Sequence, residues 1–254
     1  MASDEHLVLV PGSGCDERLF APQIDALADT LRVHVVENTE HPRIDQLAST
    51  AVQRLPERFA LAGLSQGGLV ALEIIRQAPQ RVSGLALLDT LPGPGLRIDR
   101  LRHRMAIAML ATRAFGPIDR IMWPRYVAPA RLGDTDLHDV VRAMMHATGA
   151  RGLINQQRIF LTRPDYRPLL PRITVPTLVL VGELDTLAPV AAAAETAAAI
   201  PNAELVTVPG SGHLSTLEAP TAVATALQQW LDRVEQQADA PATTTEPPTP
   251  RTAP

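Results

Sequence analysis

Lysine is absent from this chain of 254 residues, and Cys15 is its only cysteine. All 23 basic residues are therefore Arg, which is typical of a GC-rich coding bias rather than of a function. A single cysteine cannot form an internal disulfide, so nothing indicates an oxidising compartment. We expect Cys15 to be a small packed side chain.

Long apolar runs are also absent. A membrane-spanning helix needs about 18 or more apolar residues in succession, and no segment approaches that length. The N-terminal stretch MASDEHLVLVPG lacks the basic and apolar regions of a secretory signal. A net charge of −4 provides no general attraction to nucleic acid or to an anionic membrane. We therefore expect a cytoplasmic protein with neither partner.

Hydrophobic residues make up 46% of the chain, and many of them lie in short apolar runs separated by helical patterns. This alternation is typical of a parallel sheet with helices on both faces. The expected strands are 6–10, 33–37, 58–63, 85–89, 177–182 and 204–210. The expected helices are 20–31, 44–55, 69–77, 189–200 and 221–234.

The alternation stops between residues 90 and 174, where helical patterns with Pro and Gly breaks contain no clear strand. We interpret this segment as a helical cap inserted between the fourth and fifth strands. Residues 1–89 and 175–237 then form one α/β core. Residues 238–254 are rich in Pro, Thr and Ala and have almost no large apolar side chains, which predicts a disordered tail.

A Gly-x-Ser-x-Gly motif spans Gly63 to Gly67, after an expected strand and before an expected helix. In that context it is typical of a nucleophile elbow, in which Ser65 projects from a strained turn. The same small residues would also suit a plain strand-to-helix turn. A chemical role for Ser65 therefore depends on partners, because a hydroxyl is a poor nucleophile without a base.

Two residues supply those partners. His213, in the loop after the last strand, is the candidate base, and Asp185, directly after the fifth strand, is the candidate acid that orients it. All three lie at strand ends, and the chain order Ser, Asp, His is that of α/β hydrolases. Asp89 competes with Asp185 because it also ends a strand. We prefer Asp185 and expect Asp89 to cap the chain's exit into the insertion.

On these residues the chain resembles the α/β-hydrolase fold family over residues 6–234, with the elbow, GELDTLAP (182–189) and GSGH (210–213) as landmarks. The segments LVLVPGSGCDERLFAPQ and FALAGLSQGG are similar to those of a bacterial subgroup of small esterase-like members. The resemblance places the cap over the active site. It also implies an oxyanion hole made by the backbone N–H groups of Ser13 and Gln66.

Two departures from the family pattern stand out. The family commonly has His-Gly where this chain has Pro11-Gly12, and that His often braces the oxyanion loop. The family's first two antiparallel strands have no room before His6, so we expect a sheet of six strands.

The insertion carries the candidate substrate contacts. Met adapts to varied shapes, so an apolar acyl pocket could include Met105, Met109, Met122, Trp123 and Met144, although such residues at helical spacing also suit the core of a cap. Eight Arg lie between residues 97 and 131. They could attract a carboxylate- or phosphate-bearing substrate, or form a solvated helix face.

No cofactor or metal is implied. The pattern Gly-x-Gly-x-x-Gly fails at position 17, which is Glu, and the His residues lack metal-ligand spacing. We expect a serine hydrolase that cleaves a carboxylic ester of a small to medium, mainly apolar substrate through an acyl-enzyme. Thioester, lactone or carbon–carbon bond hydrolysis, perhydrolysis and acyl transfer could use the same residues, and a hydrolase-like ligand receptor is the non-enzyme alternative. The oligomeric state is not predicted.

Overall fold

The computed structural model describes residues 6–28, 31–94 and 97–239. Its centre is a six-stranded sheet in the order β2-β1-β3-β4-β5-β6, with every neighbouring pair parallel. The strands are β1 (His6–Val10), β2 (Arg32–Val35), β3 (Phe59–Leu64), β4 (Val82–Leu88), β5 (Thr177–Gly182) and β6 (Ala203–Val208). The predicted α/β fold with six strands is confirmed, and β4 begins at Val82 rather than at Leu85.

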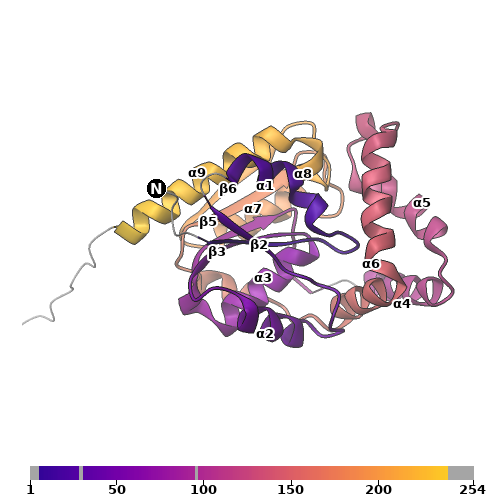
Figure 1. Cartoon of the computed structure of the whole chain (residues 1–254), viewed down its shortest axis with the longest axis horizontal. Coiled ribbons are helices and arrows are strands. Elements are labelled where there is room, and N and C mark those ends of the chain that lie inside the picture. The colour runs from indigo at the N-terminus through magenta and orange to yellow at the C-terminus, as the bar shows by residue number, and fades with distance from the viewer. Residues whose placement is uncertain (1–5, 29–30, 95–96, 240–254) are drawn as a thin grey trace, which may run out of the picture.

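Helices cover both faces of this sheet (Figure 1). In β1, Leu7 and Leu9 belong to the apolar layer under α1 and α9, whereas Val8 and Val10 face α2 and α3. Successive side chains of a strand point to opposite faces, so a continuous apolar run suits a strand buried on both sides. The helices of the core are α1 (Ala21–Leu27), α2 (Ile44–Arg54), α3 (Gln66–Gln77), α7 (Val190–Ala198), α8 (Ser215–Glu218) and α9 (Pro220–Asp239). Short 3-10 turns lie at Glu17–Phe20 and Pro79–Arg81 in the core, and at Pro129–Arg131 and Arg167–Arg172 in the segment between β4 and β5.

Between β4 and β5 the chain forms α4 (Arg97–Ala111), α5 (Phe115–Tyr126) and α6 (Thr135–Thr162), a separate layer beside the sheet (Figure 1). Asp134 caps α6 by accepting a hydrogen bond from the Leu137 amide at 2.9 Å. Gly149 interrupts α6 with a φ of +66°, a left-handed conformation that favours glycine. The part of α6 beyond this break reaches the α/β core.

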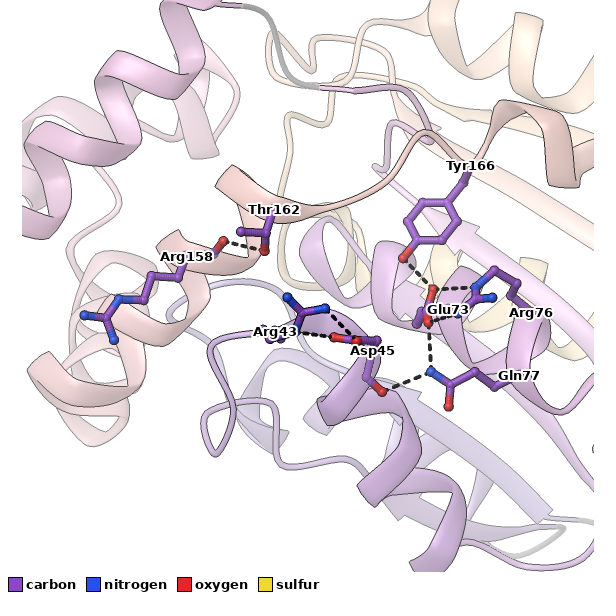
Figure 2. A network of polar contacts seen from close by, with 8 residues as sticks. All are labelled: Arg43, Asp45, Glu73, Arg76, Gln77, Arg158, Thr162 and Tyr166. Atoms are coloured by element: carbon purple, nitrogen blue, oxygen red, sulfur yellow. Dashed lines mark hydrogen bonds and ion pairs between the residues drawn. The ribbon is translucent and has the colours of Figure 1, made fainter.

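The exit of this helical layer is tied to α3, the helix that follows Ser65. The Tyr166 hydroxyl donates to Glu73 Oε2 at 2.9 Å, and both residues are buried (Figure 2). Arg76 and Gln77 also donate to the Glu73 carboxylate, at 2.6 and 2.8 Å. The described part of the chain ends at Asp239, so the predicted tail lies outside it except for residues 238–239, the end of α9.

Candidate active site

Ser65 alone forms the turn between β3 and α3. Its φ of +56° lies in the left-handed region, which residues with a Cβ rarely adopt. The neighbouring strand holds this turn, because the Ser65 amide donates to the Leu88 carbonyl at 2.8 Å and the Thr90 hydroxyl donates to the Ser65 carbonyl. The strained backbone places the Ser65 side chain at the wall of a cavity.

The small residues around Ser65 are required by close packing. A Cβ added to Gly67 would lie 1.9 Å from the Val10 carbonyl oxygen, and one added to Gly63 would lie 2.4 Å from the Gly67 backbone. The start of α3 therefore rests directly on the ends of β1 and β3. A larger residue at either position would displace the turn that carries Ser65.

His213 lies between Ser65 and Asp185. Its Nε2 is 2.9 Å from Ser65 Oγ, and its Nδ1 is 2.7 Å from Asp185 Oδ2. The other carboxylate oxygen of Asp185 accepts hydrogen bonds from the amides of Leu187 and Ala188, at 2.7 and 3.0 Å. The structure thus brings the three predicted residues together in a hydroxyl–imidazole–carboxylate chain, which can take a proton from the hydroxyl and stabilise the resulting imidazolium.

The charges around His213 suit the role of a base that the sequence predicts for it. Burial by itself lowers the pKa of this imidazole, but the carboxylate of Asp185 and its hydrogen bond raise it, with a further contribution from Asp89, and the pKa is raised overall. Only 4% of His213 is exposed. The imidazolium that forms when His213 takes a proton from Ser65 would therefore be stabilised.

The predicted oxyanion donors lie beside Ser65. The Ser13 residue lines the same cavity, and Gln66 directly follows the turn. Within the described part of the chain, neither backbone N–H donates a hydrogen bond to a protein acceptor. Both are free to donate to a substrate oxygen, as an oxyanion hole requires.

Two amide side chains brace this loop, and sequence reasoning missed both. Asn38 donates to the Pro11 carbonyl at 2.6 Å, and Gln156 of α6 accepts from the Gly14 amide at 2.8 Å. The Gln156 side chain also donates to Asn38 Oδ1 at 2.8 Å, and the Gln156 backbone carbonyl accepts from the Gln66 side chain at 2.8 Å. They hold the loop where the family commonly uses a His after the first strand. The only signal in the sequence was the absence of that His.

In the ranges that the structure describes, Asp89 does not cap the backbone where the chain enters the insertion, contrary to what the sequence predicts. Its carboxylate accepts from the Gly182 amide at 2.8 Å and from the Ser215 hydroxyl at 2.5 Å, so it joins the end of β5 to the segment after His213. Asp89 is buried and its φ is +47°. Burial, opposed by the charge of His213, raises its pKa to about 7. It contacts neither His213 nitrogen, both of which already have partners.

The loop that carries His213 is also tied to the cap. The Leu214 amide donates to the Tyr126 carbonyl at 3.0 Å, and the Tyr126 ring stacks on the imidazole with centroids 6.2 Å apart. Glu218 accepts from the Ala128 amide at 2.6 Å and from the Gly212 amide at 3.0 Å. The cap and the candidate base are therefore positioned together.

A cavity of about 720 Å³ lies between the core and the cap, with Ser65 and His213 in its wall. Met105, Met109 and Met122 line it, and their contact with a substrate stays a prediction. Trp123 and Met144 lie outside it, contrary to the prediction. Trp123 is buried, with its indole N–H on the Leu132 carbonyl at 3.1 Å, and Met144 is fully buried in the apolar core, because both face inward on their helices.

Cys15 lines the cavity too, but it is a weak candidate nucleophile. Burial, with a smaller contribution from Asp16, raises the pKa of its thiol to about 12, so it is protonated at neutral pH. In residues 6–28, 31–94 and 97–239 there is no group of three His, Cys, Asp or Glu side chains that could hold a metal ion. No helix in those residues is long and apolar enough to span a bilayer.

The fold and the site define a hydrolase of the α/β class. Residues 7–226 match the model of the alpha/beta hydrolase family, and the chain belongs to that family. It is a carboxylesterase-like enzyme.

Relatives cover almost the whole chain. It is 26% identical over 251 residues to a pimeloyl-[acyl-carrier protein] methyl ester esterase from Edwardsiella ictaluri (91% of this chain, 95% of the relative). It is 29% identical over 243 residues to the protein of that name from Xanthomonas oryzae pv. oryzae (90% and 95%). Among solved structures, a thermophilic esterase from Thermogutta terrifontis, with malate bound, is 27% identical, with a TM-score of 0.84 and 92% of each chain covered. The enol-lactonase from Burkholderia xenovorans LB400 (24% identity, TM-score 0.81, 91% and 92% covered) shares the fold.

Proposed function

We propose that the protein hydrolyses a carboxylic ester in two steps, with Ser65 as the nucleophile. The observation that carries this proposal is the chain of short contacts from Ser65 Oγ to His213 Nε2, and from His213 Nδ1 to Asp185 Oδ2, at 2.9 and 2.7 Å. Such a chain supplies both the base that a hydroxyl needs and the acid that fixes the imidazole tautomer.

In the first step, Ser65 Oγ attacks the ester carbonyl while its proton moves to His213 Nε2. The carbonyl oxygen becomes an oxyanion, and the backbone N–H groups of Ser13 and Gln66 donate to it. His213 then protonates the leaving alkoxide as the carbon–oxygen bond breaks. The products of this step are the free alcohol and an acyl-enzyme.

In the second step, water replaces the alcohol. His213 takes a proton from the water, the oxygen attacks the acyl carbon, and the oxyanion forms again in the same place. Collapse of this intermediate breaks the bond to Ser65, which regains its proton from His213. The acid is released, and no metal or cofactor takes part in these steps.

The cavity supports a small to medium, mainly apolar acyl group. Apolar cap side chains such as Met105, Met109 and Met122 line it, and its volume is about 720 Å³. Met side chains adapt to substrates of different shape. Thioesters and lactones, which react through the same tetrahedral intermediate, remain alternatives for the bond that is cleaved.

A second candidate is an acyl ester presented by an acidic carrier protein. Two relatives are named for the methyl ester of a pimeloyl-[acyl-carrier protein]. The observation in this chain that favours it is charge: between residues 97 and 163 the cap has twelve Arg and five Asp, a formal charge of +7 in a chain of net charge −4. A basic cap would attract an acidic partner toward the cavity.

A rate profile over soluble aryl esters of increasing acyl length tests the proposal. We expect the highest kcat/KM for short to medium chains and poor turnover of emulsified long-chain triglycerides. The Ser65→Ala variant, measured in parallel, should lose most of the activity, since removal of a triad member costs several powers of ten in rate. Preference for emulsified fats, or normal turnover by the Ala variant, would contradict it.

A further inference from the structure

The active-site cavity is mainly apolar, but the cap places positive charge in its wall. Two acidic groups of the cap that line it already have partners: Asp99 pairs with Arg102 at 3.2 Å, and Asp119 is 2.9 Å from a cap histidine. Arg125 and Arg163 line the cavity as well. Neither of them forms an ion pair within the part of the chain that the structure describes.

Arg163 is the more confined of the two. Its guanidinium lies over the Phe160 ring, with Cζ 5.4 Å from the ring centroid. Its Nε is buried and has no hydrogen-bond partner, and no other side-chain nitrogen of Arg163 has one among the described residues. Buried donors are nearly always paired in proteins, so an unpaired one in the wall of a binding cavity points to an acceptor supplied by a ligand.

The surroundings of Arg163 favour an anionic acceptor. Burial lowers the pKa of this guanidinium, although the charge of Asp99 opposes the change, and the group stays cationic at neutral pH. A dehydrated cation gains more from a bound anion than a hydrated one does, because the local dielectric is low.

A continuous wall connects the oxyanion loop with Arg163. Ser13 Oγ lies 3.4 Å from Gln157 Nε2, and Gln157 Oε1 lies 2.8 Å from His103 Nδ1. The His103 ring stacks on Phe160 with centroids 4.6 Å apart, and Phe160 carries the guanidinium. All five residues line the cavity. An extended acyl chain lying along this wall would have its carbonyl at the loop and its far end at Arg163.

We propose that Arg163 binds a carboxylate at the end of the substrate remote from the scissile bond. The substrate class is then the monoesters of dicarboxylic acids, or lactones that carry a second, free carboxylate. This rests on the proposed function, because the ester must be cleaved at Ser65. A planar guanidinium pairs with a carboxylate through two parallel hydrogen bonds, and the apolar wall suits the methylene chain between the two acid groups.

The test compares monomethyl esters of diacids, from succinate to suberate, with methyl esters of simple fatty acids of matched length. The variants are Arg163→Met and Arg163→Lys. Arg158→Gln is the matched control, because Arg158 (labelled in Figure 2) is an exposed residue near the end of α6, the helix that Arg163 follows, and does not line the cavity. Arg158→Gln also removes one positive charge from this region. It therefore separates direct binding of the carboxylate from a general electrostatic attraction by the cap.

The wild-type protein should prefer a diacid monoester over its neutral counterpart by about tenfold or more in kcat/KM, the usual effect of a charge-assisted hydrogen bond. Arg163→Met should abolish this preference by raising KM for the diacid monoester far more than KM for the neutral ester. Arg158→Gln should retain the preference. A wild-type protein without the preference, or a Met variant that keeps it, would overturn the inference and leave the proposed function intact.

Melting temperatures identify any variant that is misfolded, and Arg163→Lys, which keeps the charge but not the planar fork, should lose part of the preference in a folded protein. If neither kind of ester is hydrolysed, the proposed function fails. Calorimetric titration with adipate then decides the inference, since binding needs no turnover. Adipate binding that Arg163→Met removes supports it, and equal binding by both proteins overturns it.

Discussion

Gln156, on cap helix α6, accepts a hydrogen bond from the Gly14 backbone amide at 2.8 Å. The same oxygen lies 3.2 Å from the Ser13 hydroxyl, and the Gln156 amide group donates to Asn38 Oδ1. A cap side chain therefore holds the loop that carries a predicted oxyanion donor. The cap does more than enclose the cavity, because it also positions the loop that lines the cavity with Ser65.

Replacing Gln156 by Leu should reduce kcat by about 10- to 100-fold with a smaller change in KM. Loss of a single oxyanion donor typically costs about 10²–10³ in kcat, and a displaced loop costs part of that. Asn155→Leu is the control, because Asn155 donates to the Thr39 carbonyl at 2.9 Å and not to the oxyanion loop. Both variants should melt at lower temperature, but only the first should lose turnover. Equal turnover in the two variants would remove Gln156 from this role.

The two carboxyl groups near His213 can be separated by substitution. Asp185→Asn should cut turnover by as much as about 10⁴-fold in a folded protein, because the imidazole tautomer is no longer fixed. Asp89→Asn should stay active, since the amide resembles the protonated carboxyl of a group whose pKa is raised to about 7. A paired measurement of rate and melting temperature distinguishes them, and the opposite pattern would move the orienting acid to Asp89.

The pH dependence of kcat/KM should report His213. The pKa of this imidazole is raised above its ordinary value of 6.5, and the base must be neutral to take the proton of Ser65. Activity should therefore rise with pH along a limb centred above pH 6.5. In Asp185→Asn the main group that raises the pKa is gone and burial dominates, so the limb of the residual activity should move to lower pH. A limb that does not move would show that another group titrates.

Glu73 should make stability depend on acid pH. Burial raises the pKa of its carboxyl, but hydrogen bonds from Arg76, Gln77 and Tyr166 outweigh burial and lower it below the ordinary 4.5. The stabilisation is then complete above the unfolded pKa and is lost as the pH falls through the lower folded value. Glu73→Gln should melt earlier at neutral pH and respond less to acid. Glu204→Gln, which removes an exposed partner of Arg233, should change little.

The fold could be predicted from the sequence because its strands are easily recognised there. Each strand is a short apolar run, and the helices between them force a parallel sheet. The residues of the hydroxyl–imidazole–carboxylate chain could be predicted as well, because Ser65, Asp185 and His213 each follow a strand, and parallel strands end at one edge. Their distances follow from the topology, whereas their catalytic roles stay predictions.

The contacts made by the cap could not be predicted in the same way. Met105 and Met144 look alike in the sequence, yet one is exposed beside the cavity and the other is fully buried. A helical repeat predicts one apolar stripe and does not tell which neighbour the stripe faces. Asn38 and Gln156 carry no motif, since a lone amide becomes a brace only when the fold places a backbone group opposite it.

The most direct test of the central claim is covalent labelling of Ser65. The wild-type protein is treated with a fluorophosphonate probe, and intact mass followed by peptide mapping locates the adduct. We expect one adduct, on Ser65, with Ser65→Ala unlabelled and His213→Ala labelled far more slowly, because the hydroxyl then lacks its base. Ser13 is an internal control, as it lines the same cavity without a base. An adduct on Ser13 or on Cys15, or labelling that persists in Ser65→Ala, would contradict the account.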